Sequence, residues 1–136
     1  MSDTSSAALR KILAFAAIVE AGTGLAAMLS PAVVVEWLLG AEVSAVGTVL
    51  VRCFGIALLA LGLACWPSGP GADRSSPAFR AMLTYNALIA LYLAGLGIFE
   101  RIGGWLLWPA VVLHAVVALW LVWAWRGVRR AAAPTQ

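Results

Sequence analysis

The chain has 136 residues, which is enough for one domain. Hydrophobic residues make up 63% of it and charged residues 11%, against about 45–50% and about 25% in typical soluble domains. A soluble domain of this size buries only part of its chain, so it cannot remove that much apolar surface from water. The composition excludes an ordinary soluble domain and predicts an integral membrane protein.

Four apolar runs are long enough to cross a hydrocarbon core about 30 Å thick as α-helices. We expect the first helix over 10–29, because Ser30-Pro31 follows it and proline cannot continue a helix. The other three are expected over 44–66, 78–99 and 105–125. A cluster of helix breakers, PSGPG at 67–71, separates the second helix from the third.

The segment 31–43 is apolar but too short to span a bilayer. Val34, Trp37 and Leu38 recur at helical spacing, and Glu36 lies on another side. This pattern favours a short helix at the membrane surface, with an ordered loop as the alternative. The sequence therefore predicts an all-α fold, an integral membrane antiparallel four-helix bundle with a short interfacial segment after helix one. We divide it into a flexible N-terminus (1–9), one transmembrane domain (10–126) and a basic cytoplasmic tail (127–136).

Basic residues gather on one side of the expected bundle. That side holds Arg10, Lys11, Arg74, Arg80, Arg126, Arg129 and Arg130. The opposite side has Arg101 together with Glu36, Glu42 and Glu100. Cytoplasmic flanks of membrane helices carry the excess of lysine and arginine. We therefore expect a multi-pass protein of a bacterial inner (plasma) membrane with both termini in the cytoplasm.

Small and polar residues form a stripe along each expected helix. Lipid solvates neither charges nor close backbone contacts, so these stripes should face the bundle interior. In helix one the stripe is Leu13, Ala17, Glu20, Gly24 and Ala27. We assign helix packing to Gly24, Gly55, Gly62 and Gly97.

Three ionisable side chains lie within the apolar runs, namely Glu20, Arg52 and His114. A charge at the bilayer centre costs about 2.5–3.5 kcal/mol on insertion scales, so pairing Glu20 with Arg52 is the simplest solution. Asn86 and Tyr92 could complete a polar cluster. One interpretation is a site for a proton, an anion or a quinone headgroup. The other is a structural cluster that fixes helix pairing and register.

The chain lacks the residues that common cofactor sites and catalytic motifs require. One histidine cannot supply both axial ligands of a haem, and no HExxH motif, phosphate-binding loop or dinucleotide fingerprint occurs. We expect no metal site and no cofactor, and no catalytic residue or reaction can be named. The basic residues lie at the ends of apolar runs instead of forming a stripe, so we expect no nucleic-acid partner.

Three segments carry a family resemblance: RCFGIALLALGLACW at 52–66, YNALIALY at 85–92 and LWPAVVLH at 107–114. They resemble uncharacterised short bacterial four-helix membrane proteins that are loosely DoxX-like, and the resemblance extends from about Glu20 to His114. It implies a quinone-linked role, and it transfers no catalytic residue to this chain.

Two functions remain open from the sequence. The first is a non-enzymatic accessory or scaffold protein that acts through helix packing, in a homo-oligomer or a larger membrane complex. The second is proton-linked small-molecule transport or quinone binding at the central Glu/Arg/His cluster. Both require the lipid bilayer as a partner.

Overall fold

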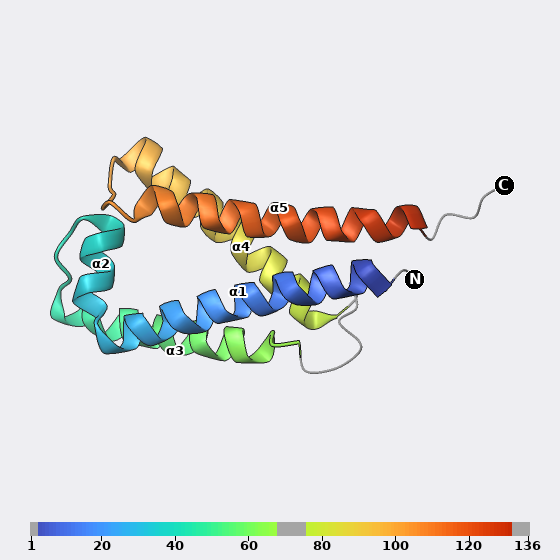
Figure 1. Cartoon of the computed structure of the whole chain (residues 1–136). Coiled ribbons are helices and arrows are strands. Elements are labelled where there is room, and N and C mark those ends of the chain that lie inside the picture. Colours follow the sequence, from blue (N-terminus) through green and yellow to red (C-terminus); the bar gives the residue numbers. More distant parts are fainter. Residues whose placement is uncertain (1–2, 68–75, 132–136) are drawn as a thin grey trace.

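A computed structural model describes residues 3–67 and 76–131, and all regular elements in these ranges are helical (Figure 1). The elements are α1 (Asp3–Leu29), α2 (Pro31–Leu39), α3 (Ala45–Ala64), α4 (Pro77–Gly95), the π-helical turn η1 (Leu96–Glu100) and α5 (Leu107–Ala131). Among the described residues, four helices are long and apolar enough to cross a membrane. The predicted all-α fold with four membrane-length helices is confirmed.

Several helix boundaries follow the local sequence signals. α1 ends at Leu29, and Pro31 then occupies the first turn of α2, where its missing N–H costs nothing. Ser44 and Ser76 cap α3 and α4, because their hydroxyl oxygens accept hydrogen bonds from the backbone N–H of Gly47 at 3.0 Å and of Phe79 at 3.2 Å. These caps fix where two of the membrane helices begin.

The outer ends of the first and last helices differ from expectation. α1 begins at Asp3, seven residues before the predicted start at Arg10, because the intervening residues contain neither proline nor glycine. α5 continues to Ala131, beyond the predicted exit at Trp125 and into the predicted tail. Residues 132–136 of that tail and 68–71 of the breaker cluster lie outside the described residues.

The four long helices form two antiparallel pairs. α1 packs mainly on α3, and α4 packs mainly on α5, while α1 also contacts α5 and the contact between α3 and α4 is slight. The start of α1 and the end of α5 lie at the same end of the bundle (Figure 1). The short segment expected after helix one is the helix α2, and it lies across the opposite end of the bundle.

Backbone contact holds the α1–α3 pair together. A Cβ atom on Gly24 would lie 2.6 Å from the carbonyl oxygen of Gly55, and a Cβ on Gly55 would lie 2.6 Å from that of Gly24. A Cβ on Gly62 would lie 2.7 Å from the carbonyl oxygen of Ala17. Gly97 differs, because a Cβ there would meet the side chains of Leu107 and Trp108. Residues without side chains therefore set the register between α1 and α3.

The loop before α5 joins the two pairs at the α2 end. The backbone N–H groups of Gly104 and Leu106 donate hydrogen bonds of 2.9 Å to the carbonyl oxygens of Leu38 and Trp37. These carbonyls belong to the last turn of α2, where carbonyl oxygens have no hydrogen-bond donor within the helix. A Cβ on Gly104 would collide with the Trp37 carbonyl, so the loop approaches α2 as closely as backbone allows. The rings of Trp37 and Trp105 pack against each other beside this contact, with their centroids 5.4 Å apart.

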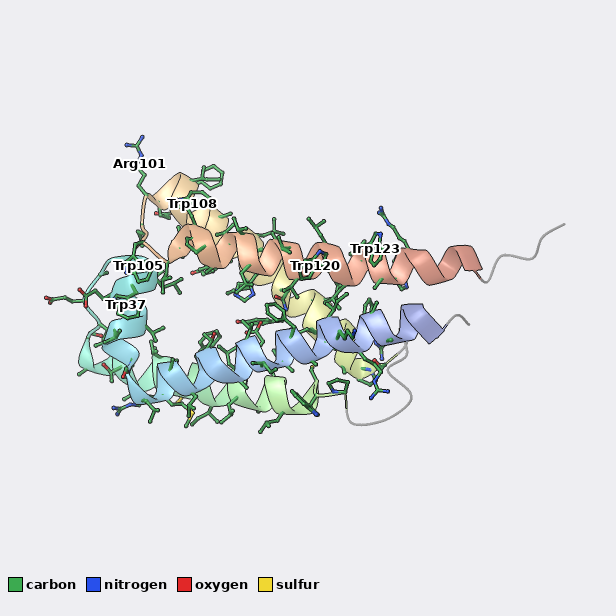
Figure 2. All side chains as sticks on the ribbon, in the orientation of Figure 1. Trp37, Arg101, Trp105, Trp108, Trp120 and Trp123 are labelled. Atoms are coloured by element: carbon green, nitrogen blue, oxygen red, sulfur yellow. The ribbon has the colours of Figure 1, made fainter. Side chains whose placement is uncertain are left out.

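Apolar side chains fill the interior and also cover the outside. The predicted stripe of α1 (Leu13, Ala17, Glu20, Gly24 and Ala27) is buried, and it meets a core that includes Met82 of α4 and Leu121 of α5. Trp37, Trp105 and Trp108 mark the α2 end, while Trp120 and Trp123 lie along α5 toward the other end (Figure 2). Exposed tryptophans near both ends of an apolar bundle are typical of membrane boundaries.

Substituting Gly24 by alanine should destabilise the protein. The new methyl group would lie 2.6 Å from backbone atoms of Gly55 and Leu59, which cannot rotate away. We expect the free energy of unfolding to fall by about 1–3 kcal/mol, the usual cost of overpacking. Thermal unfolding in a mild detergent measures the change.

Gly22→Ala is the matched control, since a Cβ at Gly22 meets nothing within 4 Å on the same helix. It should be neutral or slightly stabilising because alanine favours the helix. Equal losses in both variants would show that the α1–α3 contact is not as close as described.

Candidate functional site

Three polar side chains are buried between the helices, each from a different one. They are Glu20 of α1, Asn86 of α4 and His114 of α5, with exposed fractions of 1%, 1% and 9%. All three fall within the membrane-length segments. Over residues 7–67 and 76–126, whose side chains the structure describes, no other polar or charged side chain is buried. We call Glu20, Asn86 and His114 the polar cluster.

The amide of Asn86 is fixed by the backbone of its own helix. Its Nδ2 atom donates a hydrogen bond of 2.9 Å to the carbonyl oxygen of Met82, one turn earlier. The amide oxygen Oδ1 therefore faces the other way, and it lies 2.9 Å from Nδ1 of His114. Because a carbonyl oxygen accepts and cannot donate, Nδ1 must carry a hydrogen. In the neutral imidazole this leaves Nε2 as an acceptor.

Glu20 approaches the same imidazole nitrogen from α1. Its Oε1 atom lies 3.7 Å from Nδ1 of His114, a distance at which the two groups attract each other strongly once the imidazole is protonated. Both carboxyl oxygens are buried and make no hydrogen bond of good geometry, although the side chains of Tyr85 and Asn86 lie close enough to interact with them. Buried polar groups are normally hydrogen-bonded, so a carboxyl at this depth without a well-formed hydrogen bond needs an explanation.

Tyr85 is a cluster neighbour that the sequence prediction did not include. Its ring packs edge-on against the His114 imidazole, with centroids 5.8 Å apart. Tyr92, which was predicted for the cluster, is 64% exposed. Tyr92 is six residues from Asn86, about 9 Å along the helix, whereas Tyr85 is level with it. The position next to Asn86 in the sequence was the signal that could have identified Tyr85.

Arg52 does not join the cluster, and the expected Glu20–Arg52 pair does not form. Arg52 is exposed, and the ion-pair partner of Glu20 is His114. Gly24 lies opposite Gly55, and the antiparallel register then places Glu20 level with Leu59. Arg52 is seven residues from that level, about 10 Å at 1.5 Å per residue. The predicted pairing of Arg52 with Glu20 is wrong because the depth of each residue was measured from the ends of its helix. The contact between Gly24 and Gly55 sets the actual register.

The cluster has acid–base groups but not the ligands of a metal centre. No group of three or more His, Cys, Asp or Glu side chains that could hold a metal occurs in the described part of the chain. A carboxyl beside an imidazole can accept a proton, release one, or hydrogen-bond a polar group that enters between the helices.

Comparison with protein-family models, curated proteins and solved structures finds no match to this chain. The resemblance to DoxX-like proteins stays a prediction. Any function must therefore be argued from the polar cluster and from the surfaces of the helices.

The tautomer of His114 tests the arrangement of the cluster. His114 is the only histidine of the chain, so a histidine-specific nitrogen-15 label reports on it alone. We expect the neutral imidazole to carry its hydrogen on Nδ1, because Asn86 Oδ1 accepts from that atom. Asn86→Ala should abolish this preference in the nitrogen-15 spectrum.

Thr84→Ala is the control, since Thr84 is exposed on the same helix. It should leave the tautomer unchanged. A wild-type hydrogen on Nε2 would contradict the described orientation of Asn86.

Proposed function

We propose that this membrane protein takes up and releases a proton at the polar cluster, in support of proton-linked transport of a small molecule. The supporting observation is that both oxygens of the buried Glu20 carboxyl lack a well-formed hydrogen bond, with Tyr85 and Asn86 only loosely placed beside them. A cluster that served only to pair helices would gain stability from satisfying all its members, because an unpaired buried acceptor is costly. The carboxyl therefore retains capacity for a proton or for a hydrogen-bond donor.

Each member of the cluster has a distinct part in the proposal. Asn86 is held by Met82 and orients the imidazole through Nδ1. Glu20 is the proton acceptor, and before it accepts the proton its negative charge is compensated when His114, at 3.7 Å, is protonated. A quinone carbonyl would use the same chemistry, since it accepts a hydrogen bond from a protonated carboxyl or imidazole.

A second candidate is the accessory or scaffold function, and the surface of α3 favours it. α3 packs mainly on α1 and hardly on α4. Apart from the exposed Arg52, its remaining surface is largely apolar and includes Val49, Phe54 and Ile56. A partner helix could cover this surface in a homo-oligomer or a larger complex, where shape complementarity between helices would decide the partner.

Both candidates place the chain in a bacterial inner membrane with its termini in the cytoplasm. The described residues at the terminal end of the bundle include Arg10, Lys11 and Arg126, and Glu42 and Glu100 lie at the α2 end. This asymmetry supports the orientation by the distribution of basic flanks.

Infrared difference spectroscopy on the protein in nanodiscs tests the proton function. Changing the pH should produce a carboxyl C=O band that disappears in Glu20→Gln, because the substitution keeps the shape and removes the acid. Glu36→Gln, at an exposed carboxyl of α2, should keep the band.

Addition of quinone distinguishes quinone binding from proton transfer alone. A shift of the Glu20 band on addition of quinone would favour quinone binding over proton transfer alone. If no band belongs to Glu20 with or without quinone, the proposal fails. Retention of a partner complex by Glu20→Gln would then support the scaffold function.

A further inference from the structure

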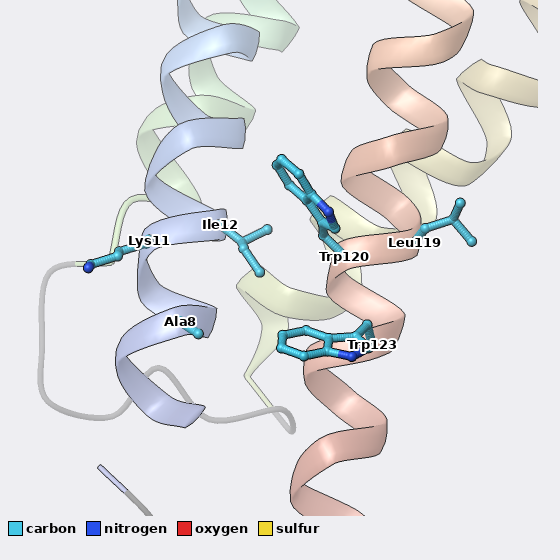
Figure 3. A pocket seen from close by; sticks show the side chains of 6 residues that line it. All are labelled: Ala8, Lys11, Ile12, Leu119, Trp120 and Trp123. Carbon is cyan, nitrogen blue, oxygen red and sulfur yellow. The ribbon is translucent and has the colours of Figure 1, made fainter. Parts of the chain in front are cut away.

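A groove runs between α1 and α5 near the end of the bundle where the chain begins and ends (Figure 3). Its volume is about 600 Å³, and it is lined by Ala8, Lys11 and Ile12 of α1 and by Leu119, Trp120 and Trp123 of α5. Ile12 of its wall packs against the buried core that includes Leu9, Leu13 and Leu121. The groove shares no lining residue with the polar cluster, so a ligand in the groove does not depend on that cluster.

The walls of the groove are apolar and aromatic. Trp120 and Trp123 project from α5 toward Ala8 and Ile12 of α1 (Figure 3). Both indoles stay largely exposed, at 49% and 68%, although each is large and apolar. In a membrane such a surface is covered by acyl chains, and tryptophan is favoured where the chains meet the headgroups. The lining therefore suits one lipid chain lying between the two helices.

Positive charge borders the groove on both helices. Lys11 lies on the flank of α1, on the side away from the two tryptophans (Figure 3). Arg126 follows Trp123 by three residues and Leu119 by seven, so it continues the same face of α5 toward the helix exit, and it is exposed. Among the lining residues whose side chains the structure describes, Lys11 is the one charged residue and none is acidic. Basic side chains at this depth attract anionic lipid headgroups.

We propose that this groove binds one anionic phospholipid of the adjacent leaflet. An acyl chain lies between Ile12 and the indoles of Trp120 and Trp123. The phosphate group is held at the membrane surface by Lys11 and Arg126. The combination of an apolar channel with flanking cations matches the two parts of such a lipid.

Native mass spectrometry of the full chain in detergent tests the site, with phosphatidylglycerol and phosphatidylcholine of identical acyl chains as the added lipids. The wild type should bind phosphatidylglycerol more tightly. Lys11→Gln and Arg126→Gln should each weaken that binding by about fivefold, the factor that corresponds to about 1 kcal/mol per basic side chain near anionic lipid. Binding of phosphatidylcholine should not change.

Matched controls separate a defined site from general attraction. Arg10→Gln removes the same charge at the same end, but Arg10 lines only a second groove beside Trp66 and Pro67, which Lys11 borders too. Arg101→Gln removes a cation at the α2 end. Both should keep the wild-type preference for phosphatidylglycerol. Ala8→Leu narrows the groove without a change of charge and should weaken binding of phosphatidylglycerol.

Three outcomes would overturn the proposal. Equal losses in Arg10→Gln and Arg126→Gln would show diffuse electrostatic attraction instead of a site. Unchanged binding in Ala8→Leu would show that the acyl chain lies elsewhere. A lipid-free dimer that Ala8→Leu dissociates would show that a second copy of the chain fills the groove.

Discussion

Hydrocarbon cannot hydrogen-bond, and this constraint decides the structure of the chain at every level. Backbone groups inside a bilayer must find their partners within the protein, so each membrane segment is a helix. The short links obey the same rule, since the last carbonyls of α2 accept hydrogen bonds from Gly104 and Leu106. Polar side chains are subject to it too, and Glu20, Asn86 and His114 all turn away from the lipid-facing surface.

Contact between glycines then determines which polar groups meet. Lipid tails are as apolar as leucine, so burial alone gives two helices little reason to associate in a membrane. Close approach of Gly24 and Gly55 supplies the contact between α1 and α3 and fixes their register. In that register Glu20 is directed toward α4 and α5, where Asn86 holds the imidazole of His114. The site therefore depends on residues that carry no chemistry of their own.

The sequence predicted the number of membrane helices and the buried face of α1, because hydrophobic length and small-residue spacing are local properties. It also identified Glu20, Asn86 and His114, since polar residues in apolar helices are few. Which side chains meet in the cluster could not be predicted from the sequence, as Arg52 shows. Whether Arg52 reaches Glu20 depends on how far α3 slides along α1, and that sliding is set by contacts between residues far apart in the sequence. The contact of Tyr85 with His114 also joins two helices, α4 and α5, although its position beside Asn86 was a local signal for it.

The coupling between Glu20 and His114 is the central claim, and a double-mutant cycle on thermal unfolding in detergent measures it directly. Glu20→Gln, His114→Gln and the double variant should give a coupling free energy of about 0.5–2 kcal/mol, the range of polar contacts between membrane helices. The corresponding cycle for Glu20→Gln and Arg52→Gln should be additive, because those side chains do not meet. Additivity in the Glu20–His114 cycle together with coupling between Glu20 and Arg52 would contradict the described cluster.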